Sequence, residues 1–330
     1  MKKLLLLNIL CLFFISCEKA LDIELPTTQS KLVINSYMIA DKYWDNKSQF
    51  LLVSNSVDGL ASLNEYIYTD SIPVISTAEA SINKIDDTSN NIIETYSLEF
   101  DSNCYCYTNP NFTPKQNDTY QLDVNLEGFT PISAKETIPS KPEYIISNLV
   151  MTGSLDGNLS SSSNWEDLCE FSITIQDQPN QANYYRLKIY VEIDGINPQT
   201  SSCKYTVQDP AFLIPINRYQ ASDNYYTGKN GYFSDDLFDG EEKTFFVEVE
   251  KPQGVWSHFY VAIESYSENL YRFNLTRKEQ KRDSNNMLFN SEPIFIESNI
   301  AEGYGIFGAR AISRKAYLPL FFPTNGWVDY

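Results

Sequence analysis

Alternation of apolar and polar residues with a period of two constrains the fold of this chain more than any other feature. Four segments place apolar side chains at every second position, with polar side chains between them: 120–126, 169–175, 185–191 and 245–249. Neighbouring side chains of a β-strand point to opposite faces, so each segment predicts a strand with one buried face. Strands of this kind are typical of antiparallel sheets. Further strands are expected at 31–38, 49–54, 79–85, 92–100 and 256–264.

The spacing of these strands predicts an all-β fold with two antiparallel β-sandwich-like domains. The segment Thr137–Pro142 contains two prolines, which cannot continue a pairing in the interior of a sheet. We therefore place the domain boundary in this segment. The first β domain is predicted to span 30–138, and a second β-rich domain 139–330.

One short helix is expected in the second domain. Ser265 and Glu268 have the spacing of a capping box, and the stretch 270–281 contains neither proline nor glycine. The helix is predicted near 267–283. Its basic side chains are interpreted as a solvated face, because charge runs usually face water.

The first residues of the chain have the features of a secretory signal. Two lysines precede a short apolar run, and Ser16 stands directly before Cys17. The apolar run is too short to cross a bilayer, which takes about 20 apolar residues. A cysteine directly after the small residue resembles the lipobox of bacterial lipoproteins, in which the thiol is lipidated and becomes the first residue. We predict a signal peptide at 1–16, lipidation of Cys17 and a lipid-anchored tether at 17–29.

Charge and anchor together define the expected location and partners. The formal net charge of the 330 residues is −18, and a chain this acidic repels nucleic acid at long range. Nucleic-acid partners are therefore excluded, and outer-membrane lipid is the expected partner of the acyl chains. Acidic residues such as Glu18 and Asp22 follow Cys17 and resemble an export signal to the outer membrane and its outer face. The predicted location is the outer membrane, facing the cell surface.

Four cysteines remain in the predicted mature body: Cys104, Cys106, Cys169 and Cys203. An even number in an exported chain favours disulfides over free thiols. The favoured pairing joins Cys169 to Cys203, with Cys104 and Cys106 either in a tight local bridge or reduced. A metal site at Cys104 and Cys106 is disfavoured because the chain has no second C-x-x-C and only one histidine.

No residue pattern reaches the standard of a catalytic site, so the protein is predicted not to be an enzyme. His258 is interpreted as a sheet-surface residue on one face with Tyr260 and Glu264, since no nucleophile motif accompanies it. The run Gly303–Gly308 matches the dinucleotide-binding pattern, but the chain ends before a βαβ unit could follow. Its glycines are expected to let a terminal strand bend or pass close to another backbone.

An acidic cluster contains Asp235, Asp236 and Asp239. Carboxylate oxygens suit Ca²⁺, but an EF-hand loop would need oxygen ligands at the positions of Leu237 and Phe246. The EF-hand is therefore excluded. Solvated loop acids are the preferred interpretation, an irregular Ca²⁺ site is the alternative, and no other cofactor is expected.

Loop aromatics are the better indication of function. The segment 211–242 has no clear period, and loops of this length are usually functional or disordered. Tyrosine gives contact area at modest entropic cost in recognition loops. The candidate partner contacts are Tyr225, Tyr226, Tyr232 and Phe233; the alternative is packing at sheet edges or between domains.

Three stretches carry a family resemblance. The lipidated start is followed by an apolar strand within 17–34, the stretch 117–124 reads Asn-Asp-Thr-Tyr-Gln-Leu-Asp-Val, and 291–309 contains Glu-Pro, Ser-Asn-Ile and Gly-Tyr-Gly-Ile-Phe-Gly. These resemble the entry strand, a Gly-Lys-Thr-Tyr-x-Leu-x-Val strand and the final run of the domain-of-unknown-function family 4249. The family comprises lipoproteins of Gram-negative bacteria. Asn117 and Asp118 replace its Gly-Lys turn, and both residues suit turns.

The resemblance implies a fold and a partner, but it has no functional residues to carry over, because the family has no established activity. It implies an immunoglobulin-like first domain. Family members commonly accompany TonB-dependent receptors, so the expected function is that of an outer-membrane accessory or binding protein that partners such a receptor in nutrient uptake. The alternatives are a surface glycan- or peptide-directed hydrolase using carboxylates or a bound cation, and a structural or adhesion module.

Overall fold

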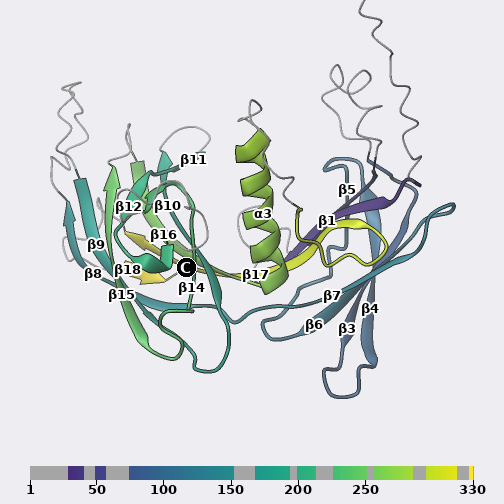
Figure 1. Ribbon diagram of the computed structural model, residues 1–330, viewed down its shortest axis with the longest axis horizontal. Coiled ribbons are helices and arrows are strands. Elements are labelled where there is room, and N and C mark those ends of the chain that lie inside the picture. Colours follow the sequence, from purple (N-terminus) through teal and green to yellow (C-terminus); the bar gives the residue numbers. More distant parts are fainter. Residues whose placement is uncertain are drawn as a thin grey trace, which may run out of the picture. The chain divides into compact units, whose positions relative to one another are not determined.

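The described part of the chain is built from strands and one α-helix (Figure 1). The structure is a computed structural model, and it describes residues 29–40, 49–56, 74–151, 168–193, 199–212, 226–250, 256–284, 295–317 and 327–329. The predicted signal peptide, the lipidation site Cys17 and nearly all of the tether lie outside these residues.

The larger of two sheets has thirteen strands in the order β11-β10-β16-β17-β1-β2-β5-β4-β3-β6-β7, with β14 paired to β10 and β18 to β17. Its strands are β1 (Leu32–Ile39), β2 (Gln49–Asn55), β3 (Glu79–Ile85), β4 (Ile92–Asp101), β5 (Cys106–Thr108), β6 (Thr119–Asn125), β7 (Ile132–Thr137), β10 (Tyr184–Ile193), β11 (Gln199–Ser202), β14 (Gly231–Ser234), β16 (Trp256–Tyr266), β17 (Tyr304–Tyr317) and β18 (Trp327–Asp329).

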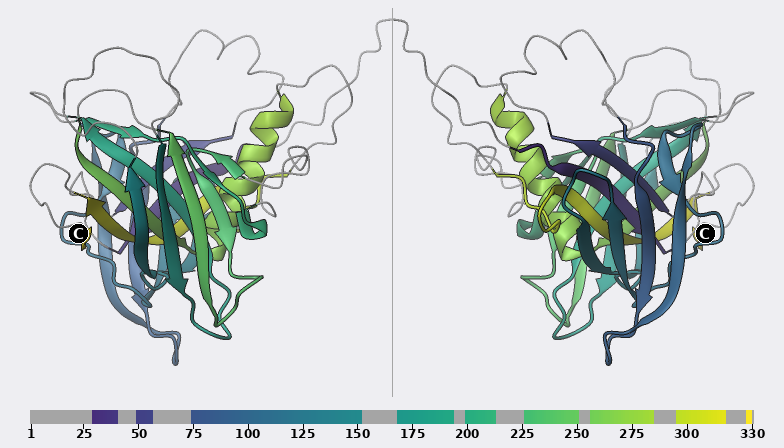
Figure 2. Two further views of the ribbon diagram at one scale, coloured as in Figure 1. Left: turned by 90° about the vertical axis from the view of Figure 1, so that its left-hand side faces the viewer. Right: turned by 90° about the vertical axis from the view of Figure 1, so that its right-hand side faces the viewer.

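The smaller sheet has five strands in the order β13-β12-β15-β9-β8 (Figure 2). Its strands are β8 (Glu143–Met151), β9 (Leu168–Gln176), β12 (Tyr205–Val207), β13 (Tyr226–Gly228) and β15 (Glu242–Glu250). A short 3₁₀ turn, η1 (Pro210–Phe212), follows β12.

The all-β prediction is confirmed, and so is each of the nine predicted strands, with bounds that differ by at most three residues. The alternation also identifies the buried faces correctly. In β6 the buried side chains are Tyr120, Leu122 and Val124, and in β15 they are Phe245, Val247 and Val249. Among the described strands, the pairing is antiparallel everywhere except between β1 and β17.

Strand β17 joins two parts of the larger sheet. Its first half pairs in parallel with β1, from Val33 opposite Tyr304 to Ile39 opposite Arg310. Its second half pairs antiparallel with β16, from Tyr266 opposite Arg310 to Phe259 opposite Tyr317. The last long strand of the chain is therefore hydrogen-bonded to the first described strand and to a strand of the second half (Figure 1).

A glycine makes the approach of β17 to β1 possible. Gly305 has a φ of +102°, and a Cβ atom added there would lie 1.8 Å from the carbonyl oxygen of Ile34. Only a residue without a side chain fits so close to the neighbouring backbone. This agrees with the prediction that the Gly303–Gly308 run serves a terminal strand and not a nucleotide.

Two apolar cores lie against these sheets. One cluster of buried residues, which we call the first core, includes Leu32, Ile34 and Leu122. It also contains four residues from a later segment: Ile300, Phe307, Ala309 and Ala311. Among the described residues, the second core draws on the stretch between Tyr144 and Ile263 and includes Phe171, Leu187 and Phe259. The predicted boundary at 138/139 falls between the residues of the two cores, apart from the 300–311 segment. Whether the two parts are separate domains, and whether the first is immunoglobulin-like, stays a prediction.

The predicted helix is α3 (Glu268–Ser284), and its placement is confirmed. The expected capping box at Ser265 is wrong, because Ser265 belongs to β16 and Ser267 precedes the helix. The backbone N–H of Tyr271 donates to the carbonyl of Ser267 at 3.0 Å, which is the first helical hydrogen bond. Leu270 and Tyr271 pack against Tyr232, Tyr266 and Ile306 beneath the helix. No helix among the described residues is both long and apolar enough to span a membrane.

The favoured disulfide between Cys169 and Cys203 is corrected by the structure. Cys104 and Cys106 form the disulfide, while Cys169 and Cys203 are free and buried. Both free cysteines belong to the second core, where cysteine packs as a small apolar residue. Burial raises the pKa of each of these thiols to about 12. Both therefore stay protonated at neutral pH and are poor nucleophiles.

Candidate functional site

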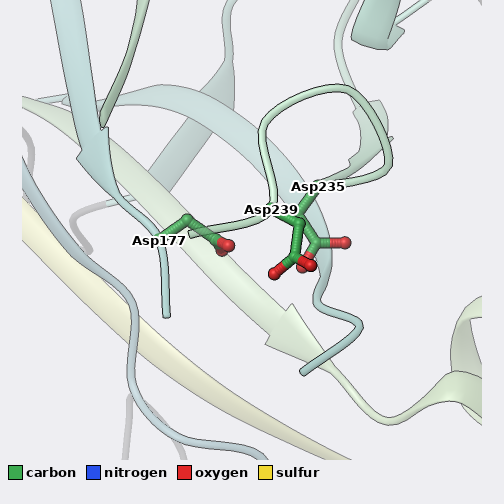
Figure 3. Close-up of side chains that lie close together, drawn as sticks. All are labelled: Asp177, Asp235 and Asp239. Atoms are coloured by element: carbon green, nitrogen blue, oxygen red, sulfur yellow. The ribbon is translucent and has the colours of Figure 1, made fainter. Parts of the chain in front are cut away.

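Three carboxylates converge where the second core meets its connecting loops. Asp177 directly follows β9, and Asp235 and Asp239 lie in the turn between β14 and β15 (Figure 3). One carboxylate oxygen from each residue lies within 4.8 Å of the others. Asp177 and Asp235 are buried, whereas Asp239 is exposed.

Each of these carboxylates also accepts hydrogen bonds that link the loops. Asp177 accepts the Tyr185 hydroxyl at 2.9 Å and the Gly240 backbone N–H at 2.9 Å. Asp235 accepts the backbone N–H of Asn183 at 2.8 Å, and Asp239 accepts that of Asn180 at 2.9 Å. The cluster thus connects the β9–β10 loop to the β14–β15 turn.

The same arrangement could hold a divalent cation, because carboxylate oxygens are the ligands that Ca²⁺ prefers. Burial raises the pKa of Asp235, and the charge of Asp177 raises it further, since two carboxylates that lie close together are repulsive. A cation would relieve this repulsion. The hydrogen bonds that already satisfy these groups give the cluster a structural role without a cation.

Two of the three predicted acidic residues belong to this cluster, and one does not. Asp236 is exposed and accepts the Ser234 hydroxyl at 2.8 Å. Sequence reasoning missed Asp177 because it lies 58 positions before Asp235. The pairing of β9 with β15 could have located it. Gln176 lies opposite Glu242, so the next residue, Asp177, lies beside the turn that precedes β15.

His258 lies on the sheet face that the alternation predicts. The ring is stacked on Tyr260 with centroids 5.5 Å apart, and its Nδ1 atom lies 3.2 Å from a carboxylate oxygen of Glu192. Phe259, Val261 and Ile263 point to the second core on the opposite face. Glu192 also accepts the Tyr260 hydroxyl at 3.0 Å. His258 is therefore a paired residue of the sheet surface.

The predicted partner contacts Tyr232 and Phe233 are corrected by their burial. Phe233 is 1% exposed in the second core, and Tyr232 is 6% exposed beneath α3. Both lie in the short strand β14, which supplied too few residues for a visible alternation. The other two predicted contacts are not tested. Tyr225 lies outside the described residues, and of Tyr226, in β13, only the backbone is described. The alternative interpretation, packing of these aromatics, holds for Tyr232 and Phe233.

A groove with a volume of about 650 Å³ runs along the start of β8. Charges of both signs line it, including Lys141, Glu143, Glu242 and Lys315. Tyr144 is buried beside it and donates its hydroxyl to the carbonyl of Val261 at 2.7 Å. This mixed lining has no single preferred ligand charge.

With this geometry in place, the chain can be compared with known proteins. The family model described as "Domain of unknown function (DUF4249)" matches residues 18–316. The chain belongs to the DUF4249 family. The match includes β1 and nearly all of β17, so the family pattern extends over both cores. No curated protein matches the chain.

Solved structures show only distant likeness to this DUF4249 protein. The major pilin SpaA of Corynebacterium diphtheriae aligns at 9% identity and a TM-score of 0.25, over 87% of this chain and 69% of the pilin. Trypsin-activated alpha-2-macroglobulin of Escherichia coli aligns at 10% identity and a TM-score of 0.20, over 72% of this chain and 14% of that one. The Fcho1 Mu homology domain of Danio rerio aligns at 10% identity and a TM-score of 0.20, over 86% of this chain and 92% of that one. Scores this low transfer no function.

Proposed function

We propose that this protein is a lipid-anchored outer-membrane binding protein that faces the cell surface and partners a TonB-dependent receptor in nutrient uptake. The observation that carries the proposal is the pairing of Ser16 with Cys17 behind a secretory signal. Acyl chains on that cysteine bury CH₂ groups at about 0.8 kcal/mol each, so two or three chains hold the protein at the membrane.

The length of chain between the anchor and the fold suits contact with a membrane partner. Residues 18–31 separate Cys17 from the first residue of β1, Leu32. A chain spans at most about 3.3–3.6 Å per residue, so this segment reaches no more than about 50 Å. The folded body therefore stays within reach of a neighbouring receptor.

The outer face of the five-stranded sheet is the surface that we assign to the partner. Three large apolar side chains on this face are half exposed or more: Ile145 (62%), Val150 (51%) and Phe246 (50%). The strand that carries the first two, β8, is an edge strand, paired only with β9. Edge strands with apolar side chains are common sites of contact with another chain.

Charge supports a protein partner over direct adsorption to lipid. The net charge of −18 repels anionic head groups, so the protein depends on its acyl chains and on specific contacts to stay at a membrane position. A receptor would supply these specific contacts.

Purification from membranes tests the anchor and the partner separately. The full chain, extracted in mild detergent, is expected to co-purify with a barrel receptor, and Cys17→Ser is expected to move it from the membrane to the soluble fraction. Mass spectrometry should find acyl chains on Cys17. A membrane-extracted chain that elutes alone would overturn the partner, and an unacylated Cys17 would overturn the anchor.

A matched pair of variants locates the contact. Phe246→Asp puts a charge on the assigned face and is expected to reduce receptor recovery by about tenfold or more, because a desolvated charge weakens an apolar interface. Leu237→Asp is the control, since Leu237 is 51% exposed and lies outside that face. Equal recovery with both variants would move the contact elsewhere.

A surface hydrolase is the second candidate, and the convergence of Asp177, Asp235 and Asp239 favours it. Such an enzyme would use a cation held by these carboxylates to polarise its substrate. Asp239→Ala should then abolish a cation-dependent activity against cell-surface polysaccharides. An activity that survives this change, or the lack of any activity in the wild type, would exclude the candidate.

A further inference from the structure

The outer face of β10, β16 and β17 carries an unusual concentration of positive charge. Strand register places Arg186 opposite Glu264 and Lys188 opposite Ala262, and it places Arg314 opposite Ala262 from the other side. Leu187, Ile189 and Ile263 alternate with them and face the second core. We call this surface the charged face.

One carboxylate, Glu264, lies among three cations on the charged face. Glu264 is 3% exposed, and its oxygens lie 3.7 Å from Arg186 Nε, 3.6 Å from Lys188 Nζ and 3.5 Å from Arg310 Nη1. Arg314 lies on the same face and donates to the Tyr190 hydroxyl at 3.3 Å, so cations outnumber carboxylates here on a protein whose net charge is −18. Glu192 lies on the same face of β10, 3.2 Å from Nδ1 of His258.

The cations share one counter-ion, and Arg186 also donates to the Tyr266 hydroxyl and to Asn230 Oδ1, each at 2.8 Å. Charge-assisted N–H···O bonds normally measure about 2.7–2.9 Å, so the three contacts to Glu264 are long. Buried Nε atoms of Arg186 and Arg310 have no hydrogen-bond partner among the described residues. A buried cation without full pairing is costly, and an anion bound nearby would lower that cost.

A cavity of about 240 Å³ opens on the charged face beside these groups. Its lining includes the basic residue Lys188, the hydroxyl-bearing residues Tyr190, Thr200 and Ser202, and the apolar residue Ile312. Its volume equals that of about eight water molecules, which is also the scale of a single sugar ring or a small organic acid.

The described charged residues that line the cavity are one cation, Lys188, and one carboxylate, Glu264. Burial alone would raise the pKa of Glu264, but Arg310, Arg186 and Lys188 hold this pKa at about 2, so the carboxylate stays ionised. Glu264 lines the same cavity as Lys188. Lys188 is therefore the one cation among the described lining residues, which matches a ligand with a single carboxylate.

We propose that this cavity binds a small organic acid with one carboxylate and several hydroxyl groups, of the uronic acid class. Lys188 binds the carboxylate, because an ammonium pairs strongly with it where water is partly excluded. Thr200 and Ser202 exchange hydrogen bonds with the hydroxyl groups. Ile312 and the Tyr190 ring contact the carbon skeleton, as apolar and aromatic surfaces do in small-molecule sites.

Calorimetric titration of the full chain in detergent tests the proposal. The probes are D-galacturonate, D-glucuronate, D-galactose, lactate and inorganic phosphate. A uronate is expected to bind at one site per chain, with galactose and phosphate at least about tenfold weaker, since each lacks either the carboxylate or the single charge. Tighter binding of phosphate, or no binding of any uronate, would overturn the proposal. Equal binding of lactate would overturn the role of the hydroxyl groups.

Three variants assign the site, and each is checked for folding by circular dichroism. Lys188→Met keeps the length of the side chain and should weaken uronate binding at least about tenfold. The double change Thr200→Val and Ser202→Ala, at exposed positions, should weaken it about threefold to tenfold and leave lactate unchanged. Lys135→Met, on β7, is the matched control. Wild-type affinity in both the Lys188 and the Thr200/Ser202 variants would overturn the site. The titration contains no receptor, so its result does not depend on whether the protein co-purifies with one.

Discussion

The two cores of this protein are assembled from the sequence in different ways. In the part of the chain that the structure describes, the second core draws its residues from one stretch between Tyr144 and Ile263. The first core begins with Leu32, yet it takes Phe307, Ala309 and Ala311 from the other end of the described chain. Contacts between distant residues close large loops and form slowly. The first core is therefore the one whose completion depends on the end of the chain.

The largest effect is expected from a substitution that disrupts the β1–β17 pairing, which completes the first core. Gly305→Ala would place a Cβ atom 1.8 Å from the carbonyl oxygen of Ile34, at a φ of +102°. We expect a loss of about 4 kcal/mol or more in the free energy of unfolding. Urea denaturation measures the loss, and hydrogen exchange should rise in β1 and β2 before β9 and β15.

Gly128→Ala is the control for this experiment. Gly128 has a positive φ of +85°, but an added Cβ atom would meet nothing within 4 Å. It should cost only about 1 kcal/mol, from backbone strain alone. Equal losses at the two glycines would contradict the role assigned to the β1–β17 contact.

The next effect concerns the sheet that covers the second core. Glu264→Gln removes the one buried carboxylate among Arg186, Lys188 and Arg310, and it should cost about 3–5 kcal/mol. Thermal and urea unfolding measure the change. Glu250→Gln removes an exposed ion pair with Lys204 and should cost less than about 1 kcal/mol. A Glu264 variant as stable as the Glu250 variant would show that the cations need no counter-ion.

A pH-dependent effect is expected where the first core meets the helix. Burial raises the pKa of Glu136 to about 7 from 4.5, against the opposing hydrogen bond from Asn269 of α3. Because the folded-state pKa is the higher one, this group's contribution to stability is complete below about pH 4.5 and is lost as the pH rises through 7.

Glu136→Gln removes this dependence. The variant should gain on the order of 2 kcal/mol relative to the wild type between pH 4.5 and 7. Urea midpoints at several pH values measure the difference. Glu99→Gln, at an exposed position of β4, should show no such trend. A constant difference between wild type and Glu136→Gln would contradict the assignment.

The smallest effect is expected at the disulfide near the first core. Cys104 and Cys106 are two residues apart, so the bridge closes a very short loop and restricts the unfolded chain little. Replacing both by serine should cost about 1 kcal/mol, measured by urea denaturation beside the reduced wild type. A loss comparable to that of Gly305→Ala would mean that the bridge organises more than its own turn.

The sequence predicts local structure well in this protein because burial follows alternation. Tyr120, Leu122 and Val124 repeat at every second position, so both the strand and its buried face could be derived. The same logic placed His258 and Glu264 on one face. Strands such as β14, with four residues, are too short to carry the pattern, and Tyr232 and Phe233 were therefore assigned to a loop.

Pairing between distant segments could not be derived in the same way. Alternation says which face of a strand is buried but not which strand lies beside it, so the parallel β1–β17 pair was not expected. Asp177 and Lys188 were missed for the same reason, since their partners lie on other strands. The free state of Cys169 and Cys203 is also tertiary information, because an even cysteine count does not fix the pairing.

The double pairing of β17 sets an order of events in synthesis. A ribosome releases the chain from its amino end, and β1 emerges when β17 has not yet been made. Until the last segment is free, Leu32 and Ile34 have no parallel neighbour and stay accessible to chaperones and proteases. A truncated product that ends before residue 304 should therefore expose β1 to chaperones and proteases, although the sequence of β1 itself is unchanged.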